Sequence, residues 1–202
     1  MALGLSQAQT EVHIYDQDDI DETNLNRQVL FYKAVGQPKA PVLAARLQQL
    51  FPKMKLCGYG LAIDERSSQH LSAPLLVACP DNFAVRALLN DVACSRQKTL
   101  VNDGTSAMGG SCMTYAPQHT ACLSCRLNID ELAQQERQAR SCAQVEASVV
   151  TSNAITGALM AWKTRELGAG KVKAGIWEYD GRGRGVRVGV HSPRPPCGCH
   201  LS

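Results

Sequence analysis

The sequence predicts an α/β protein whose Rossmann-like, mostly parallel sheet is flanked by helices. Apolar β-rich runs alternate with helical patterns at short intervals through the first half of the 202-residue chain, which is the pattern of such a sheet. The run PLLVAC at 74–79 is apolar throughout, as expected for a strand that is buried on both faces. Asp16 and Asp81 each follow a strand-like run, and ligands of parallel sheets bind outside the carboxyl ends of the strands.

The expected elements of the first half follow from the positions of apolar residues and prolines. Pro38 and Pro41 fit the first turn of a helix, and Val42, Leu47 and Leu50 continue its apolar stripe. The first half is therefore expected to contain strands at 11–15, 55–63, 74–79, 99–103 and 109–117, and helices at 38–51 and from Asp81 or Asn82 onward.

The second half of the chain is less regular. Residues 129–144 are polar and predict a solvent-exposed helix or a crossover segment. Residues 148–167 predict a long helix with small residues inside it. Strand-like runs at 173–180 and 185–191 flank the sequence GRGR and predict a β-hairpin. The tail at 192–202 is rich in proline, so we expect little regular structure there.

The composition excludes several classes of function. Hydrophobic residues make up 45% and charged residues 19% of the chain, which is a globular composition. The net charge is +3 without a basic tract, and only 5% of the residues are aromatic, so we expect neither a nucleic-acid surface nor a polybasic membrane surface. No apolar run approaches the roughly 18 residues of a membrane span, and the N-terminus lacks the features of a signal peptide. We therefore expect a cytoplasmic protein.

Four of the nine cysteines lie in two tight clusters, CLSC and CGCH. Clustered cysteines in a chain without a signal peptide indicate metal ligands rather than disulfides. The Cys122-x-x-Cys125 spacing lets both sulfurs reach one tetrahedral Zn²⁺ at about 2.3 Å. We expect a zinc site that pins the C-terminal hairpin and tail, formed by Cys122, Cys125 and Cys197 with Cys199, or with His200 in its place. The alternative is buried packing for CLSC and free thiols in the tail, but a proline-rich tail gains no core packing from cysteines.

The stretch IYDQDDIDETNLNRQVLF, residues 14–31, places five acidic residues after a strand-like run and follows them with Asn24 and Arg27. It is either a solvated charged loop or part of a nucleotide site. The acids between the strand and Asn24 are most simply a loop spacer; they are Asp18, Asp19, Asp21 and Glu22.

Five stretches of the chain together resemble the HesA/MoeB/ThiF superfamily, the adenylating enzymes related to ubiquitin-activating enzymes. They are DQDDIDETNLNRQVLF, VGQPKA, ACPDNFAVR, the two cysteine clusters, and SCAQVEASVVTSNAITGALMAWKTREL. The resemblance implies a Rossmann-like fold that binds ATP and Mg²⁺ and transfers AMP to the C-terminal glycine of a ubiquitin-like or sulfur-carrier protein with a Gly-Gly tail. It also implies a homodimer or a pseudo-symmetric heterodimer.

The resemblance implies a role for each residue that matches a family motif. Asp16 matches the acid that holds the ribose hydroxyls, and Asn24 and Arg27 match the pair that faces the phosphates. Lys39, at an expected helix start, matches the lysine that contacts phosphate, where helix N–H groups would act on the same anion. Asp81 matches the ligand of Mg²⁺, a cation that prefers hard oxygen donors. Arg27 and Lys39 would then stabilise charge during the reaction.

Each of these residues also has a purely structural interpretation. Arg27 alone would be a surface arginine, Lys39 an ordinary first-turn lysine and Asp81 an N-cap, so it is their joint spacing that favours a site. Arg86 is expected to be a structural ion-pair partner. Cys142 matches the cysteine that forms a thioester or persulfide in some family members, and a free surface thiol is the alternative.

Family members begin with a strand, a glycine-rich GxGxxG loop and a helix, all upstream of the strand that ends in the acid. Only about ten residues precede that strand here, so we expect residues 1–202 to form a single ThiF-like adenylation domain that lacks its N-terminal strand and loop. Three interpretations follow: an adenylating enzyme, a catalytically inactive binding subunit of a heteromeric activating complex, and a Rossmann oxidoreductase. The chain retains all five candidate phosphate, ribose and magnesium ligands, which favours the first interpretation. The third leaves Arg27, Lys39 and Asp81 unexplained.

Overall fold

The computed structural model describes residues 10–139, 149–171, 175–183, 185–189 and 197. Its strands are β1 (Glu11–Tyr15), β2 (Lys55–Tyr59), β3 (Leu75–Ala78), β4 (Thr99–Ser106), β5 (Gly109–Tyr115), β6 (Gly175–Asp180) and β7 (Gly185–Gly189). Its helices are α2 (Lys39–Leu50), α3 (Phe83–Ser95), α4 (Leu123–Arg126), α5 (Ile129–Ala139) and α6 (Val150–Gly168), with the short 3₁₀ helices η1 (Glu22–Asn26), η2 (Val29–Phe31) and η3 (Ser67–His70). The expected α/β class is confirmed.

The described strands form two sheets rather than one. β1 and β2 pair in parallel as a two-stranded sheet. The larger sheet has the order β3-β4-β5-β6-β7, in which β3 and β4 are parallel and the later neighbours are antiparallel. The parallel pairing expected for the first half therefore holds for β1–β2 and β3–β4. The direction reverses after β4 because only two residues connect it to β5, which is the length of a hairpin turn.

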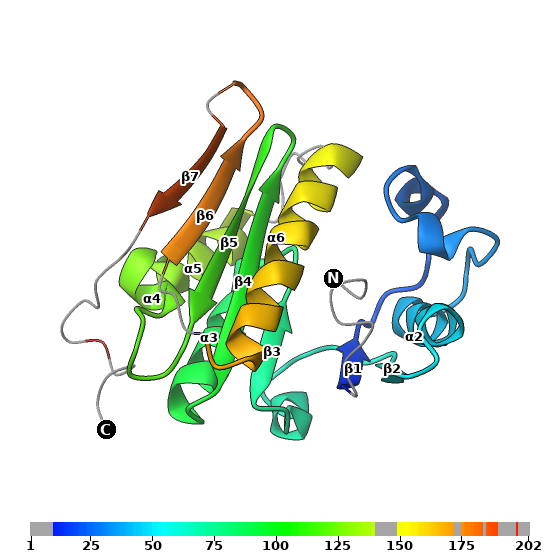
Figure 1. The fold of residues 1–202 in the computed structure, drawn as a ribbon, viewed down its shortest axis with the longest axis horizontal. Helices are drawn as coiled ribbons and strands as arrows, with labels where there is room; N and C mark the ends of the chain where they lie inside the picture. Colours follow the sequence, from blue (N-terminus) through cyan, green and yellow to red (C-terminus); the bar gives the residue numbers. More distant parts are fainter. Residues whose placement is uncertain (1–9, 140–148, 172–174, 184, 190–196, 198–202) are drawn as a thin grey trace.

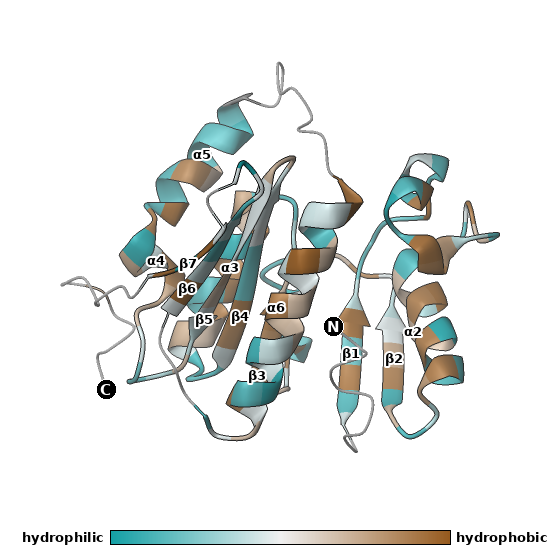
Figure 2. Cartoon of the chain, turned by 45° about the horizontal axis from the view of Figure 1, so that its top comes forward, coloured by the Kyte–Doolittle hydropathy of each residue, from teal (hydrophilic) through white to brown (hydrophobic). Residues whose placement is uncertain are grey.

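Helices cover both faces of the larger sheet (Figure 1). α6 packs across β4 and β5 on one face, while α3, α4 and α5 lie together on the other. α5 is largely hydrophilic in Figure 2, which agrees with the polar sequence expected for this segment. α2 packs against β2 in the smaller unit. None of the described helices is long and apolar enough to cross a membrane.

One core cluster connects the smaller sheet to the rest of the molecule. It includes Leu76 of β3, Leu89 of α3 and Leu100 of β4, all buried. Tyr15, the last residue of β1, packs against this cluster. The residue that follows Tyr15 is Asp16, so the contact of Tyr15 with the core also holds the carboxyl end of β1 against the larger sheet.

Most predicted elements are observed with small shifts at their ends. The helix expected at 148–167 runs over Val150–Gly168, and the hairpin expected near the C-terminus is formed by β6 and β7. The strand expected at 55–63 ends earlier, at Tyr59. Of the residues expected to pin this hairpin through zinc, Cys199 and His200 lie outside the described part of the chain.

The close approach of α2 to β2 requires a glycine at position 58. A Cβ atom there would lie 2.2 Å from the carbonyl oxygen of Ala40 and 2.7 Å from Cα of Pro41. Both are backbone atoms in the first turn of α2, so a side-chain rotation cannot relieve the contact. Gly58 therefore sets how closely the start of α2, and with it Lys39, approaches the sheet.

We expect Gly58→Ala to lower the free energy of unfolding by about 1–3 kcal/mol, because the added methyl group must push α2 away from β2. Gly157→Ala in α6 is the matched control: its Cβ would meet nothing within 4 Å, and alanine in a helix is favoured over glycine by about 0.5–1 kcal/mol. Urea unfolding followed by circular dichroism measures both changes. Equal stability of the Gly58 variant and the parent protein would contradict the close packing.

Candidate functional site

Asp16 lies directly after β1, at the carboxyl end of the strand. Its N–H donates to the carbonyl oxygen of Tyr59 at 3.2 Å, which extends the contact between β1 and β2 by one residue. Its carboxylate Oδ1 accepts a hydrogen bond from the N–H of Asp18 at 2.9 Å. Burial raises the pKa of Asp16 above its usual range, and the negative charges of Asp18 and Asp81 act in the same direction. Tyr15, just before Asp16, packs against the core cluster to which Ala78, the last residue of β3, belongs.

Lys39 begins α2 and is tied to the loop that follows β1. Its Nζ lies 2.8 Å from Oδ2 of Asp18, and its N–H donates to the carbonyl oxygen of Asp18 at 2.9 Å. The Lys39 side chain is only 14% exposed, whereas that of Asp18 is 56% exposed. The charge of Lys39 also lowers the pKa of Asp16 and partly offsets the effect of burial. Asp18, which the sequence suggested to be a loop spacer, is thus the partner of the candidate phosphate-binding lysine.

Asn24 and Arg27 lie in and just after the short helix η1. Asn24 is buried, and its Oδ1 accepts a hydrogen bond from the N–H of Asp21 at 3.1 Å, as part of a capping box. Arg27 donates through Nη1 to the carbonyl oxygen of Thr23 at 3.2 Å and to Oδ1 of Asn26 at 2.9 Å. Both residues therefore have structural contacts of their own, which the sequence did not reveal.

Asp81 is exposed and lies three residues beyond the end of β3, just before α3. The N-cap of α3 is Asn82, whose Oδ1 accepts a hydrogen bond from the N–H of Val85 at 2.8 Å. Asn82 also donates through Nδ2 to Oδ1 of Asp81 at 3.1 Å. Asp81 is therefore not used as the N-cap, and its carboxylate keeps acceptor capacity for a ligand.

Arg86 of α3 holds the segment before Asp81 in place. Its Nη1 lies 3.4 Å from Oδ1 of Asp103, and the guanidinium also donates to the backbone carbonyl oxygens of Pro80 and Asp103. Burial raises the pKa of Asp103, and Arg86 lowers it in part. Arg86 is thus a structural ion-pair partner, as expected, and its partner Asp103 is a partly buried acid that the sequence did not indicate.

The polar helix α5 also contacts the start of α3. Oε2 of Glu136 accepts a hydrogen bond from the N–H of Phe83 at 2.8 Å, so this carboxylate satisfies one of the free N–H groups of the helix start. Glu136 therefore ties α5 to the residues that follow Asp81. A glutamate in a polar helix carries no signal of such a long-range contact, which explains why the sequence did not indicate it.

Three of the predicted zinc ligands come together in a separate place. Sγ of Cys122 lies 3.8 Å from Sγ of Cys125 and 3.4 Å from Sγ of Cys197, and all three sulfurs lie within 4.8 Å of one another. Two thiolates on one tetrahedral zinc, each at about 2.3 Å from the ion, are about 3.8 Å apart. Cys122 and Cys125 are buried and Cys197 is partly exposed. The donor types and spacing therefore fit Zn²⁺.

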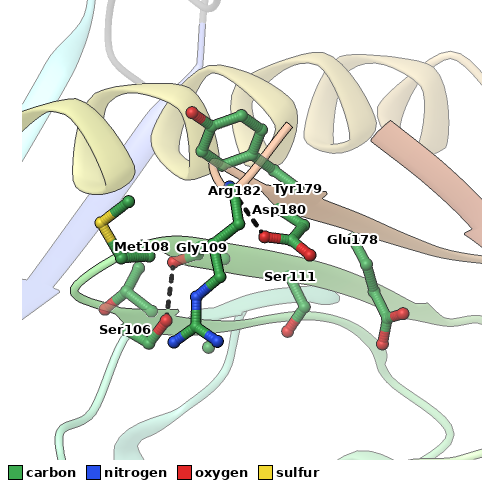
Figure 3. A pocket seen from close by; sticks show the side chains of 11 residues that line it. Ser106, Met108, Gly109, Ser111, Glu178, Tyr179, Asp180 and Arg182 are labelled. Atoms are coloured by element: carbon green, nitrogen blue, oxygen red, sulfur yellow. Dashed lines mark hydrogen bonds between the residues drawn. The ribbon is translucent and has the colours of Figure 1, made fainter. Parts of the chain in front are cut away.

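A polar surface hollow of about 490 Å³ lies at the turn between β4 and β5 (Figure 3). Ser106, Glu178, Asp180 and Arg182 are among its lining residues. Oδ1 of Asp180 accepts a hydrogen bond from the N–H of Arg182 at 2.9 Å, which shapes the turn after β6. None of the five candidate nucleotide-site residues lines this hollow, so we place the candidate site at the strand ends instead.

Cys142, the candidate for a thioester or persulfide link, lies outside the described residues. The structure describes the chain on both sides of it, up to the end of α5 at Ala139 and again from Val149, just before α6. Its role stays a prediction.

Comparison with known proteins gives a consistent result. The sequence model of the ThiF family matches residues 2–199. A sulfur carrier protein adenylyltransferase of Thermus thermophilus is 37% identical over 93 residues, which are 45% of this chain and 34% of that protein. A NEDD8-activating enzyme E1 catalytic subunit of Saccharomyces cerevisiae is 30% identical over 142 residues, which are 65% of this chain and 47% of that protein.

An adenylyltransferase and sulfurtransferase of Drosophila persimilis is 26% identical over 194 residues, which are 91% of this chain and 42% of that protein. The chain thus spans less than half the length of each of these three relatives. Among solved structures, E. coli MccB superposes with a TM-score of 0.81 at 20% identity and covers 98% of this chain and 60% of its own. That likeness shows the fold. MccB has also been solved with ATP.

The raised pKa of Asp16 predicts that its charge costs stability. The folded chain holds this proton to higher pH than the unfolded chain, so stability falls as the pH rises through the folded-state pKa. We therefore expect Asp16→Asn to stabilise the protein at neutral pH, by up to about 1 kcal/mol because water screens a half-exposed charge. The gain should vanish below the ordinary pKa of an aspartate, about 3.9.

Asp64→Asn is the matched control with the opposite sign. Hydrogen bonds from Ser67 lower the pKa of Asp64, so its carboxylate contributes stability that is lost as the pH falls through its folded-state pKa. Thermal unfolding of both variants and the parent between about pH 3 and 8 makes the comparison. A loss of stability for Asp16→Asn at neutral pH would show that the charge of Asp16 is favourably paired.

Proposed function

The chain belongs to the ThiF family, and from this premise we propose that it catalyses the ATP-dependent adenylation of the C-terminal glycine of a ubiquitin-like or sulfur-carrier protein. The observation that carries the proposal is the position of Asp16 and Asp81 just beyond β1 and β3, each of which pairs in parallel with its neighbouring strand. That edge of a parallel sheet is where ligands bind. Lys39, at the start of α2, is bound to Asp18 in the loop that follows β1.

Asp16 and Lys39 would hold opposite ends of the nucleotide. Asp16 keeps carboxylate acceptor capacity beyond its one bond from the N–H of Asp18, which suits the hydroxyls of a ribose. Asp18 holds Lys39 over the same loop. A triphosphate carries more negative charge than the Asp18 carboxylate and would bind Lys39 more strongly. This lysine would then exchange Asp18 for phosphate when ATP binds.

Asn24 and Arg27 would add donors toward the phosphates. The Asn24 cap uses the amide oxygen as the acceptor, and the NH₂ group of the same amide is a donor that could face an anion. Arg27 makes its two described bonds through Nη1 alone, so Nε and Nη2 retain N–H groups for an anion. Their structural contacts are therefore compatible with the proposed role.

In this reaction the protein would contribute mainly positioning and charge rather than covalent chemistry. An oxygen of the glycine carboxylate attacks the α-phosphorus of ATP, the bond from that phosphorus to the bridging oxygen breaks, and pyrophosphate leaves. Two anions approach each other, so positive charge from Arg27 and Lys39 should supply most of the stabilisation. Asp81 would hold Mg²⁺, which supplies further charge neutralisation on the phosphates when bound.

The named relatives support the type of reaction and the class of partner. One acts as a sulfur carrier protein adenylyltransferase and another as a NEDD8-activating subunit.

The oligomeric state, a homodimer or a pseudo-symmetric heterodimer, stays a prediction. The alternative function is a catalytically inactive binding subunit of a heteromeric activating complex, which would bind the carrier protein without activating it.

Exchange of labelled pyrophosphate into ATP tests the enzyme proposal. We expect the protein to exchange label only when a Gly-Gly-tailed carrier protein is present, and Lys39→Ala to slow the exchange by about 10-fold or more because a phosphate contact is lost. Lys53→Ala is the matched control, since Lys53 is an exposed lysine between α2 and β2. Carrier binding without any exchange would contradict the enzyme proposal and favour the inactive subunit.

We also propose that Cys122, Cys125 and Cys197 bind one Zn²⁺ together with Cys199 or His200. Sulfur–sulfur separations of 3.8 Å and 3.4 Å support this proposal. A four-ligand site leaves no open position for catalysis. Its role would be to fix the C-terminal tail onto the core cluster to which Cys122 and Cys125 belong.

Metal analysis after dialysis against a weak chelator tests the zinc proposal. We expect about one tightly held zinc per chain, and we expect Cys125→Ser to lose it and to unfold at a lower temperature because metal binding contributes to folding. Cys94→Ser is the matched control, since Cys94 is a partly buried cysteine of α3 that packs against the same core cluster but is not one of the three grouped sulfurs. Equal zinc content in the two variants would contradict this site.

A further inference from the structure

A second group of metal-ligand side chains lies on the smaller sheet, away from the thiol cluster. In the parallel β1–β2 pair, Glu11 is opposite Lys55 and His13 is opposite Cys57. Paired residues of neighbouring strands point to the same face of a sheet. Gly58, which is next to Cys57, faces α2. The face that carries Glu11, His13 and Cys57 is therefore the one opposite α2.

The donor atoms of these three residues are already close together. Nε2 of His13 lies 2.9 Å from Oε1 of Glu11, and the two atoms and Sγ of Cys57 all lie within 4.8 Å of one another. The side chains of His13 and Glu11 are 30% and 46% exposed, so an ion can reach them from solvent. A small inward movement would bring all three donors within bonding distance of one ion.

The local charges favour the ligating form of the carboxylate. Lys55, whose Nζ lies 2.8 Å from Oε1 of Glu11, and His13 both lower the pKa of Glu11. A carboxylate has two oxygens, so Lys55 can keep one while the other binds a cation. Lys55 would then act as the outer partner that orients a ligating carboxylate.

We propose that Glu11, His13 and Cys57 form a binding site for a divalent cation of the zinc type. One thiolate, one imidazole and one carboxylate suit Zn²⁺ or Co²⁺, whereas Mg²⁺ and Ca²⁺ prefer oxygen donors alone. Water would fill the fourth position on the exposed face. Binding would use the Cys57 sulfur as a thiolate and would replace the hydrogen bond between His13 and Glu11.

Such an ion would join β1 to β2 at the start of the strand that leads to Asp16. A cation that binds only the folded chain stabilises it in proportion to its concentration. The site is therefore expected to support the smaller sheet, whose hydrogen-bonded pairing rests on two strands of five residues each. This inference concerns different residues from the nucleotide site and does not depend on the proposed reaction.

Cobalt titration tests the proposal. A weak chelator removes loosely bound metal but not the zinc proposed for the Cys122 thiol cluster, and Co²⁺ is then added while the cobalt–thiolate absorption band is recorded. We expect one Co²⁺ per chain with a band of single-thiolate intensity. Cys57→Ala should abolish the band, and His13→Ala should weaken binding at least about 10-fold because a metal ligand is lost.

Cys94→Ala and His70→Ala are the matched controls, since these residues lie in α3 and η3 and belong to neither group of ligands. Both should bind Co²⁺ like the parent. Absence of a thiolate band from the parent protein at saturating Co²⁺ would overturn the proposal, whatever the folding of the variants. An unchanged band in a folded Cys57→Ala protein would overturn it as well.

Discussion

The candidate site depends on holding the half-buried carboxylate of Asp16 at the end of β1, while a second acid, Asp81, follows β3. Burial and the charges of Asp18 and Asp81 raise the pKa of Asp16, so this charge weakens the fold when no ligand is present. Tyr15 holds the end of β1 against the main core, and Arg86 holds the segment before Asp81. Clustered acids with an unfavourable charge are typical of functional sites, where a cationic or hydrogen-bonding ligand relieves the cost.

The same core cluster supports both the proposed zinc site and the proposed nucleotide site. Cys122 and Cys125 are buried members of the cluster against which Tyr15 packs. A zinc ion on those sulfurs would stabilise the cluster, and through Tyr15 it would support the strand that ends at Asp16. The second metal site proposed on β1 and β2 would act on the same strand from its other end. The smaller sheet has only two described strands, and isolated two-stranded units are of marginal stability.

Periodicity and turn residues predicted most helices and strands because these signals are local. The division into two sheets was not predictable in this way, since strand pairing depends on contacts far apart in the chain. The same limit applies to the site. The sequence predicted that Asp16 and Asp81 follow strands, and they do, but the pairing of Lys39 with Asp18 depends on the fold of the loop. The pairing of His13 with Cys57 could likewise not be predicted from the sequence, because it depends on the register between β1 and β2.

The central claim is that Asp16 and Asp81 act on one nucleotide, one through the ribose and the other through a metal ion. Calorimetric titration of the parent protein, Asp16→Asn and Asp81→Asn with ATP, in the presence and absence of Mg²⁺, tests this claim most directly. The account predicts one saturable site in the parent, weaker binding to Asp16→Asn under both conditions, and weaker binding to Asp81→Asn only when Mg²⁺ is present. Binding of ATP to both variants as tightly as to the parent in Mg²⁺ would contradict it.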